Sequence, residues 1–143
     1  MKRNQKGFTL AELLIVVAII AVLVAISIPI FNSQLEKSRE STDIANLRSA
    51  KAEGLAAFLT DEAPLVTITN GARTYNDMWY NISSGKLQST FIAVGKGTDA
   101  VPSGASYADA SEYNYTGGNV VGQGIKVTAT AADGVTVRFS TAS

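Results

Sequence analysis

An uninterrupted apolar run near the N-terminus constrains this chain more than any other feature. No residue from 13 to 30 carries a charge, and every residue from Leu13 to Ile26 is apolar. With its flanks the run gives about 20 membrane-compatible residues, the length that a spanning helix needs. Lys2, Arg3 and Lys6 precede it, so the positive-inside rule predicts a cytoplasmic N-terminus, with the rest of the chain outside the inner membrane.

A helical pattern continues beyond this run. The apolar residues thin to a stripe spaced mostly by three or four residues, as an amphipathic helix requires. This stripe consists of Phe31, Leu35, Ile44, Leu47, Leu55, Phe58 and Leu59, and the charged residues that fall mainly off it are Glu36, Lys37, Arg39, Glu40, Asp43 and Arg48. We expect one helix over residues 8–59, about 78 Å long at 1.5 Å per residue. Pro29 is expected to kink or weaken it, because proline lacks an amide hydrogen and clashes with the preceding turn.

Residues 60–143 have a different character. They are rich in Gly, Ser, Thr, Asn, Tyr and Val. Apolar residues alternate with polar ones over residues 125–131 and 135–139, on either side of Asp133-Gly134, which predicts a β-hairpin with one apolar face. Leu65–Thr69 and Leu87–Val94 are further strand candidates, and Gly95–Gly124 has the composition of a long loop.

These segments together predict an α+β fold. A small antiparallel sheet would pack on the C-terminal half of the long helix. Trp79, with its neighbours Met78 and Tyr80, is expected to belong to that packing. The N-terminal half of the helix would extend past this small domain, so something outside the domain has to cover it.

The residue types that are missing narrow the chemistry. The chain has no cysteine and no histidine, which excludes disulfides and thiolate metal sites and removes the commonest general base. We therefore expect no catalytic residue, no metal site and no cofactor. Acidic and basic residues balance at 12 each, and no nucleic-acid partner is predicted, since such surfaces usually cluster Lys and Arg.

The residues around Gly7 form a more specific pattern. A short basic leader ends in Lys6-Gly7, Phe8 follows, Glu12 comes four residues later, and then the apolar run begins. This pattern resembles the processing site of the type IV pilin and type II pseudopilin superfamily, and Pro29 lies where pilin helices commonly carry a proline. The resemblance covers residues 1–59; in the remainder it is only architectural.

The resemblance implies a pilin fold and a processed precursor. A membrane-embedded prepilin peptidase would cut after Gly7 and methylate the new amino group of Phe8. An assembly ATPase and an inner-membrane platform would then add the subunit to a helical homo-oligomeric filament at the cell surface, for adhesion or twitching motility. The implied parts are a leader (1–7), a transmembrane and polymerisation half of the helix (8–30), an amphipathic half (31–59) and a β-rich head (60–143).

Glu12 also has a physical interpretation of its own. A lone carboxylate in an apolar membrane segment is costly, and such residues are functional candidates by default. The free amine of Phe8, on the same chain or on a neighbour, is the expected partner, because pairing offsets the desolvation of both charges. Glu12 is thus expected to align an incoming subunit, and Pro29 to supply local flexibility during assembly.

Several alternatives remain open at this stage. Within the superfamily, the chain could be a pseudopilin of a type II secretion system or of a competence pilus. An ordinary signal peptide cut near Ala25-Ile26-Ser27, or a plain single-span anchor, would instead give a secreted or membrane-anchored binding module. Asp99, Asp109 and Glu112 match no compact calcium loop, and Tyr107, Tyr113 and Tyr115 are expected to pack locally.

Overall fold

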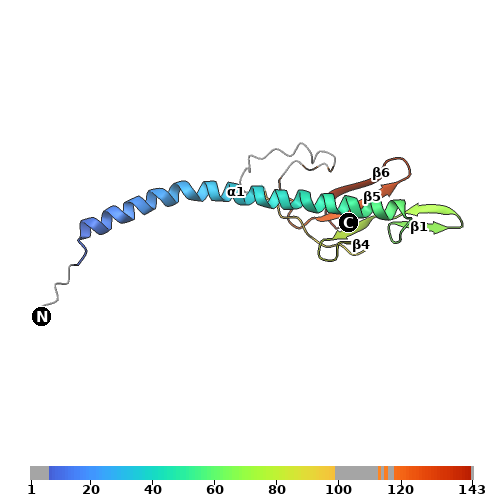
Figure 1. The fold of residues 1–143 in the computed structure, drawn as a ribbon, viewed down its shortest axis with the longest axis horizontal. Helices are drawn as coiled ribbons and strands as arrows, with labels where there is room; N and C mark the ends of the chain where they lie inside the picture. Colours follow the sequence, from blue (N-terminus) through green and yellow to red (C-terminus); the bar gives the residue numbers. More distant parts are fainter. Residues whose placement is uncertain (1–6, 99–112, 114, 116–117, 143) are drawn as a thin grey trace.

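One long helix carries a small β-rich head at its C-terminal end (Figure 1). The computed structural model describes residues 7–98, 113, 115 and 118–142. Helix α1 spans Leu10–Leu59. The strands are β1 (Val66–Thr69), β2 (Ala72–Tyr75), β3 (Met78–Asn81), β4 (Lys86–Gln88), β5 (Gly124–Thr130) and β6 (Gly134–Ser140). The predicted α+β fold, a long N-terminal helix on an antiparallel sheet, is confirmed.

Helix α1 is a single element from end to end. It begins after Thr9, whose side chain caps the first turn, and it ends at Leu59, after which the amide of Thr60 donates to the carbonyl of Ala56. Pro29 lies inside the helix without interrupting it. Figure 1 shows a gradual curve in this half of α1 where the sequence predicted a kink. The helix is thus continuous at Pro29 in the single chain, and the predicted local weakening there stays a prediction.

The head contains two sheets. Strands β3 to β6 form a four-stranded antiparallel sheet in the order β4-β3-β5-β6, and β1 pairs only with β2 in a separate hairpin. The predicted strand Leu87–Val94 is wrong beyond Gln88, because residues 89–98 have no regular structure. Strands β2 and β3 were not predicted.

Two tight connections fix the registers of the hairpins. Asn70 and Gly71 join β1 to β2 with φ angles of 53° and 80°, the left-handed geometry that a two-residue hairpin turn requires. The predicted hairpin at the end of the chain is confirmed, with Thr130 opposite Gly134 and Val127 opposite Val137. Gly134 adopts a φ of 69° at its turn.

The core lies between α1 and the inner face of the four-stranded sheet. Leu47, Ile125 and Val127 are fully buried there. Gly54 allows a close approach of α1 to the sheet, since a Cβ atom at this position would lie 2.7 Å from a methyl group of Val127. On the outer face of the sheet Trp79 is covered by Phe91, whose ring meets it edge-on at 4.8 Å.

The β1–β2 hairpin is fastened to the end of α1 by Arg73. Its guanidinium donates to the carbonyl of Phe58 at 2.9 Å and pairs with the carboxylate of Asp61. It also lies over the rings of Phe58 and Tyr75 at 5.2 and 5.9 Å. These contacts tie the hairpin to the helix although it shares no sheet with the rest of the head.

The face of α1 that packs on the head differs from the predicted apolar stripe. Ile44 and Leu47 are buried as expected, but Phe31, Leu35, Leu55 and Leu59 are exposed. The buried face consists instead of Glu36, Glu40, Asp43, Ile44, Leu47, Ala50, Gly54 and Ala57. The prediction that Glu36, Glu40 and Asp43 lie off the buried face is wrong.

Candidate assembly site

The N-terminal half of α1 stands clear of the head (Figure 1). Its large apolar side chains from Leu13 to Ile30 are each 48–66% exposed, and the most hydrophobic window of the helix is not buried at all. Among the described residues, α1 is the one helix long and apolar enough to cross a membrane. An apolar surface of this length in water would be unfavourable, so this half requires lipid or protein around it.

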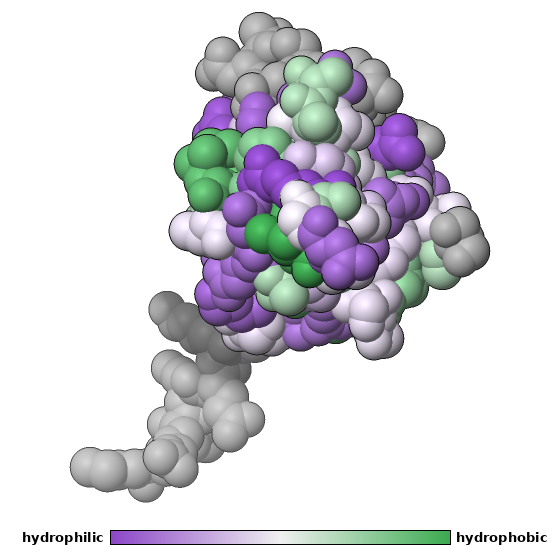
Figure 2. Space-filling view, turned by 90° about the vertical axis from the view of Figure 1, so that its right-hand side faces the viewer, coloured by the Kyte–Doolittle hydropathy of each residue, from purple (hydrophilic) through white to green (hydrophobic). Residues whose placement is uncertain are grey.

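The surface of the head is different. Viewed from the end of the head that lies away from the N-terminal half of α1, hydrophobic residues form separate patches on a mostly hydrophilic surface (Figure 2). Such a surface is compatible with water. The two halves of the molecule therefore suit two environments, an apolar one around residues 10–30 and an aqueous one around the head.

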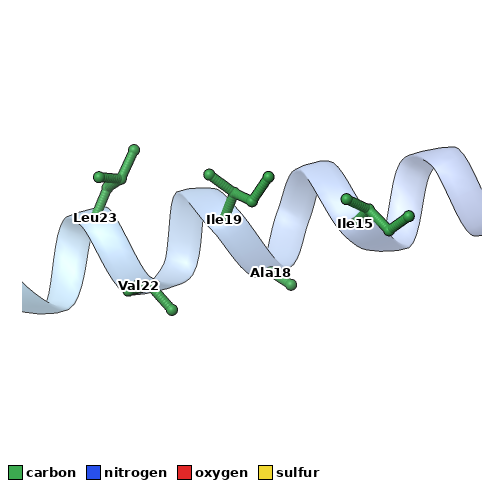
Figure 3. Close-up of a pocket in the computed structure, with 5 residues that line it drawn as sticks. All are labelled: Ile15, Ala18, Ile19, Val22 and Leu23. Atoms are coloured by element: carbon green, nitrogen blue, oxygen red, sulfur yellow. The ribbon is translucent and has the colours of Figure 1, made fainter.

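Shallow grooves run between the apolar side chains of this half. Figure 3 shows one of them, with Ile19 and Leu23 pointing to one side of the helix and Ala18 and Val22 pointing to the other. Ala18 leaves space between its larger neighbours, and small residues let another helix approach closely in an apolar environment. The hydroxyl of Ser27 donates to the carbonyl of Leu23 at 2.7 Å, so this polar group is satisfied within the helix.

Glu12 is held at the start of α1 by Thr9. The amide of Thr9 donates to Oε2 of Glu12 at 2.8 Å, and the hydroxyl of Thr9 donates to the same oxygen at 2.7 Å. In return the amide of Glu12 donates to Oγ1 of Thr9 at 3.2 Å. These bonds form a capping box, which satisfies amides that the first turn of a helix leaves unpaired. This capping box was not predicted, although the pattern Thr-x-x-Glu in the sequence is its signal.

Gly7 and Phe8 lie just before this capping box. Phe8 is 92% exposed, and a side chain added at Gly7 would meet no atom within 4 Å. Gly7, Phe8 and Glu12 are thus at the same open end of the chain, whereas Pro29 lies several turns away along α1. The roles predicted for these four residues stay predictions, and Lys2, Arg3 and Lys6 lie outside the described residues.

An uncharged stripe that was not predicted follows the exposed side of α1 over the head. We call it the outer stripe. It consists of Phe31, Leu35, Ser38, Thr42, Ala45, Ser49, Ala52, Ala56 and Leu59, all exposed and spaced alternately by four and three residues. This spacing is that of the contact seam of a coiled coil. The stripe continues the uncharged surface of residues 13–30 to the end of the helix.

The buried side of α1 carries three carboxylates. Glu36, Glu40 and Asp43 are 2%, 4% and 0% exposed. Burial raises the pKa of Asp43, and hydrogen bonds from the amides of Gly97 and Lys96 offset only part of this effect. Burial also acts to raise the pKa of Glu36, but bonds from Thr98 and Arg39 together outweigh it, so the pKa of Glu36 is lowered.

The remaining candidates from the sequence do not form a site in the described structure. Tyr113 and Tyr115 are buried, as expected for local packing, whereas Tyr107 and the possible calcium ligands Asp99, Asp109 and Glu112 lie outside the described residues. In the part of the chain that the structure describes, no group of three or more Asp or Glu residues is arranged to hold a metal ion.

Known proteins match both the N-terminal segment and most of the chain. Residues 2–28 match the family described as "Prokaryotic N-terminal methylation motif". The chain is 32% identical over 120 residues to "Fimbrial protein Q" of Moraxella bovis, and the alignment covers 82% of this chain and 75% of the relative. The chain belongs to the type IV pilin superfamily. It is a structural pilus subunit and not an enzyme, as the sequence predicted.

Two further pilin relatives match over shorter segments. The "Type IV major alpha-pilin" of Moraxella bovis is 38% identical over 63 residues, and the "Type IV major fimbrial protein FimA" of Dichelobacter nodosus is 43% identical over 61 residues. The alignments span 40% and 35% of the lengths of these two pilins. No solved structure gives a significant match to the chain.

Proposed function

We propose that this pilin is made as a precursor in the inner membrane, with its N-terminus in the cytoplasm, cut after Gly7 and assembled into a helical surface filament through α1. The observation that carries this proposal is the exposed apolar half of α1, which ends in the capping box of Thr9 and Glu12. Residues 1–7 would be the leader, 8–30 the membrane and polymerisation half, 31–59 the amphipathic half, and 60–143 the head.

Processing requires an accessible peptide bond next to the membrane segment. Gly7 and Phe8 are open to a protease, since neither is covered by another part of the described chain. The match to an N-terminal methylation motif supports methylation of the new Phe8 amine. A prepilin peptidase is the expected enzyme for both steps, and a pilus assembly ATPase with its membrane platform is the expected machinery for the next one.

Glu12 would then guide each new subunit into place. Thr9 donates both of its hydrogen bonds to Oε2 of Glu12 and none to Oε1. That oxygen can accept from the amine of Phe8, on the same chain or on a neighbour. A carboxylate inside an apolar bundle gains most from such a partner, because an unpaired charge there is strongly unfavourable.

The outer stripe extends the surface available for packing between subunits. It carries no charge, and several of its residues are small, which permits close contact between helices. A second copy of α1 or of the head can therefore lie along it without burying an unpaired charge. A contact that repeats without closing on itself produces a helical filament. Adhesion or twitching motility is the use that we propose for this filament.

The mass of the N-terminal peptide tests the processing step. We expect protein sheared from the cell surface to begin at N-methylated Phe8. A soluble product beginning at Ile28 would contradict the proposal and indicate a secreted domain. For the assembly step, Glu12→Ala is expected to reduce the number or length of pili, and pili of wild-type number and length would show that Glu12 does not align subunits.

A further inference from the structure

Two short stretches of the head lie against α1 where its buried face begins, and neither belongs to a strand. They are residues 94–98 and 118–123. They bind each other, since the amides of Val94 and Gly95 donate to the carbonyl of Gln123 at 2.8 and 3.1 Å. The amide of Val120 donates to the carbonyl of Gly97 at 3.0 Å. The two stretches therefore form one local unit.

Glycine permits this close pairing. A Cβ atom on Gly95 would lie 2.1 Å from the carbonyl oxygen of Val120, and one on Gly97 would lie 2.7 Å from that of Gly118. Both distances are too short for any side chain to fit without moving the backbone. The unit can thus bring its backbone amides directly against α1.

Three successive backbone amides of this unit point at carboxylates of α1. The amide of Lys96 donates to Oδ1 of Asp43 at 2.9 Å, and the amide of Gly97 donates to Oδ2 at 2.6 Å. The amide of Thr98 donates to Oε1 of Glu36, and its hydroxyl donates to Oε2 at 2.8 Å. Successive amides that converge in this way form a concave anion site, which the helix fills with its own side chains.

The second stretch has a weaker contact of the same kind. The amide of Gly118 donates to Oε1 of Glu40 at 3.4 Å. The hydroxyl of Tyr115 lies 3.5 Å from Oδ2 of Asp43. Arg39 contributes a cation, with Nη1 at 3.2 Å from Oε2 of Glu36. Backbone amides outside any strand thus find their acceptors in side chains of α1.

Two apolar side chains also hold this unit in place. Val94 and Val120 are buried in the hydrophobic core, whereas residues 96–98 and 118 contact α1 through polar groups. The chain has no cysteine, so no disulfide can fix these residues to the helix. Their attachment depends on hydrogen bonds that span more than 50 residues of sequence.

We propose that Glu36, Glu40 and Asp43 form a charged clasp that holds residues 96–98 and 118 on α1, and that this clasp opens locally while the rest of the head stays folded. The four-stranded sheet keeps its own backbone hydrogen bonds when the clasp opens, and Val94 and Val120 stay in the core that they share with it. Segments held by few apolar contacts are the ones that open at the lowest free energy. The clasp thus divides the head into a stable sheet and a part that can detach.

Hydrogen exchange of the full-length pilin in detergent micelles tests the clasp. The double variant Glu36→Gln, Asp43→Asn keeps the shape of both side chains but removes their charges and two acceptor atoms. We expect the amides of residues 96–98 to exchange about tenfold faster or more, with β5 and β6 unchanged. Glu53→Gln is the matched control, because Glu53 lies on the same helix and pairs with Lys86 on the surface.

Unchanged exchange at residues 96–98 in the double variant would overturn the proposal. Wild-type protein gives a second test that does not depend on the variant folding. In low concentrations of urea, the amides of residues 96–98 should exchange by a local opening that is insensitive to urea, whereas those of β5 and β6 should follow global unfolding. If both groups show the same dependence on urea, the clasp does not open separately.

Discussion

The carboxylate of Glu12 accepts hydrogen bonds from both the amide and the hydroxyl of Thr9, at 2.8 and 2.7 Å. The residue that sequence analysis selects for assembly therefore already has a partner within its own chain. Thr9 fixes the rotamer of Glu12 in the first turn of α1. In the proposed filament, that bond would set the direction in which this carboxylate meets the next subunit.

Thr9→Val removes the hydroxyl and keeps the shape of the side chain. We expect the first turn of α1 to fray, since loss of an N-cap costs about 1 kcal/mol, and we expect fewer pili. Hydrogen exchange of residues 10–13 and counts of sheared pili measure the two effects. Thr9→Ser retains the hydroxyl and should behave as wild type. Wild-type exchange and pili in Thr9→Val would show that the capping box has no role.

Charge on the outer stripe should block assembly without unfolding the subunit. Ala45 and Ala52 are exposed, and surface substitutions of this kind change stability by about 0.5 kcal/mol or less. Ala45→Glu and Ala52→Glu are therefore expected to keep the melting temperature and to reduce the amount of pili. Thr141→Glu adds the same charge to the exposed segment that follows β6 and serves as control. Full piliation by both helix variants would exclude the stripe from subunit contacts.

Gly54 sets the distance between α1 and the sheet. An added methyl group would lie 2.7 Å from Val127 and 2.9 Å from Val135, and the β-branched side chains around it cannot turn away easily. Gly54→Ala should destabilise the head by about 1–3 kcal/mol, although alanine favours helix more than glycine does. Thermal unfolding of the full chain in micelles measures this loss.

A second substitution identifies the contact responsible. Adding Val127→Ala to Gly54→Ala makes room for the new methyl group, so the double variant should be more stable than the sum of the two single effects predicts. Strict additivity would mean that the helix moves away from the sheet as a whole and that Val127 does not limit the approach.

The stability contribution of Glu36 should depend on pH. Its pKa is lower in the folded protein than its ordinary value, so its ionised form contributes stability above the unfolded pKa, and this contribution is lost as the pH falls through the folded pKa. The difference in urea midpoint between wild type and Glu36→Gln is expected to be largest near neutral pH and to shrink in acid. A difference that grows in acid would contradict the assignment.

Asp43 should show the opposite sign. Burial raises its pKa, so its contribution is fully present below the unfolded pKa and is lost as the pH rises through the folded pKa. The two carboxylates can be followed separately by their carbon chemical shifts. Asp43 is expected to take up its proton at a higher pH than an ordinary aspartate does, and Glu36 at a lower pH than an ordinary glutamate does.

The long helix and the final hairpin could be predicted because their signals are periodic. Residues 8–59 keep helical spacing throughout, and Ile125 to Phe139 alternate strictly around one turn. Strand β3 gives no such signal, since Met78, Trp79 and Tyr80 are all buried, with Phe91 covering the outer face. Strand β2 is exposed over most of its length and has no apolar face to detect.

The buried carboxylates could not be predicted for a different reason. A charge on a helix is normally solvated, and periodicity arguments place it on the outer face. The amides that Asp43 and Glu36 bind come from residues 96–98, far along the chain and outside any strand. Neither the composition nor the residue spacing shows that these two segments meet in the fold. The capping box, in contrast, is visible in the sequence as Thr-x-x-Glu.

The continuity of α1 has a mechanical consequence. A single helix runs from Leu10 to Leu59 and continues past Pro29, which donates no amide hydrogen bond. Tension applied to the head of a subunit would therefore reach the far end of α1 along the axis of one continuous helix. A fibre of such subunits would stretch mainly by sliding of one helix against another. The contacts between subunits would therefore set its stiffness.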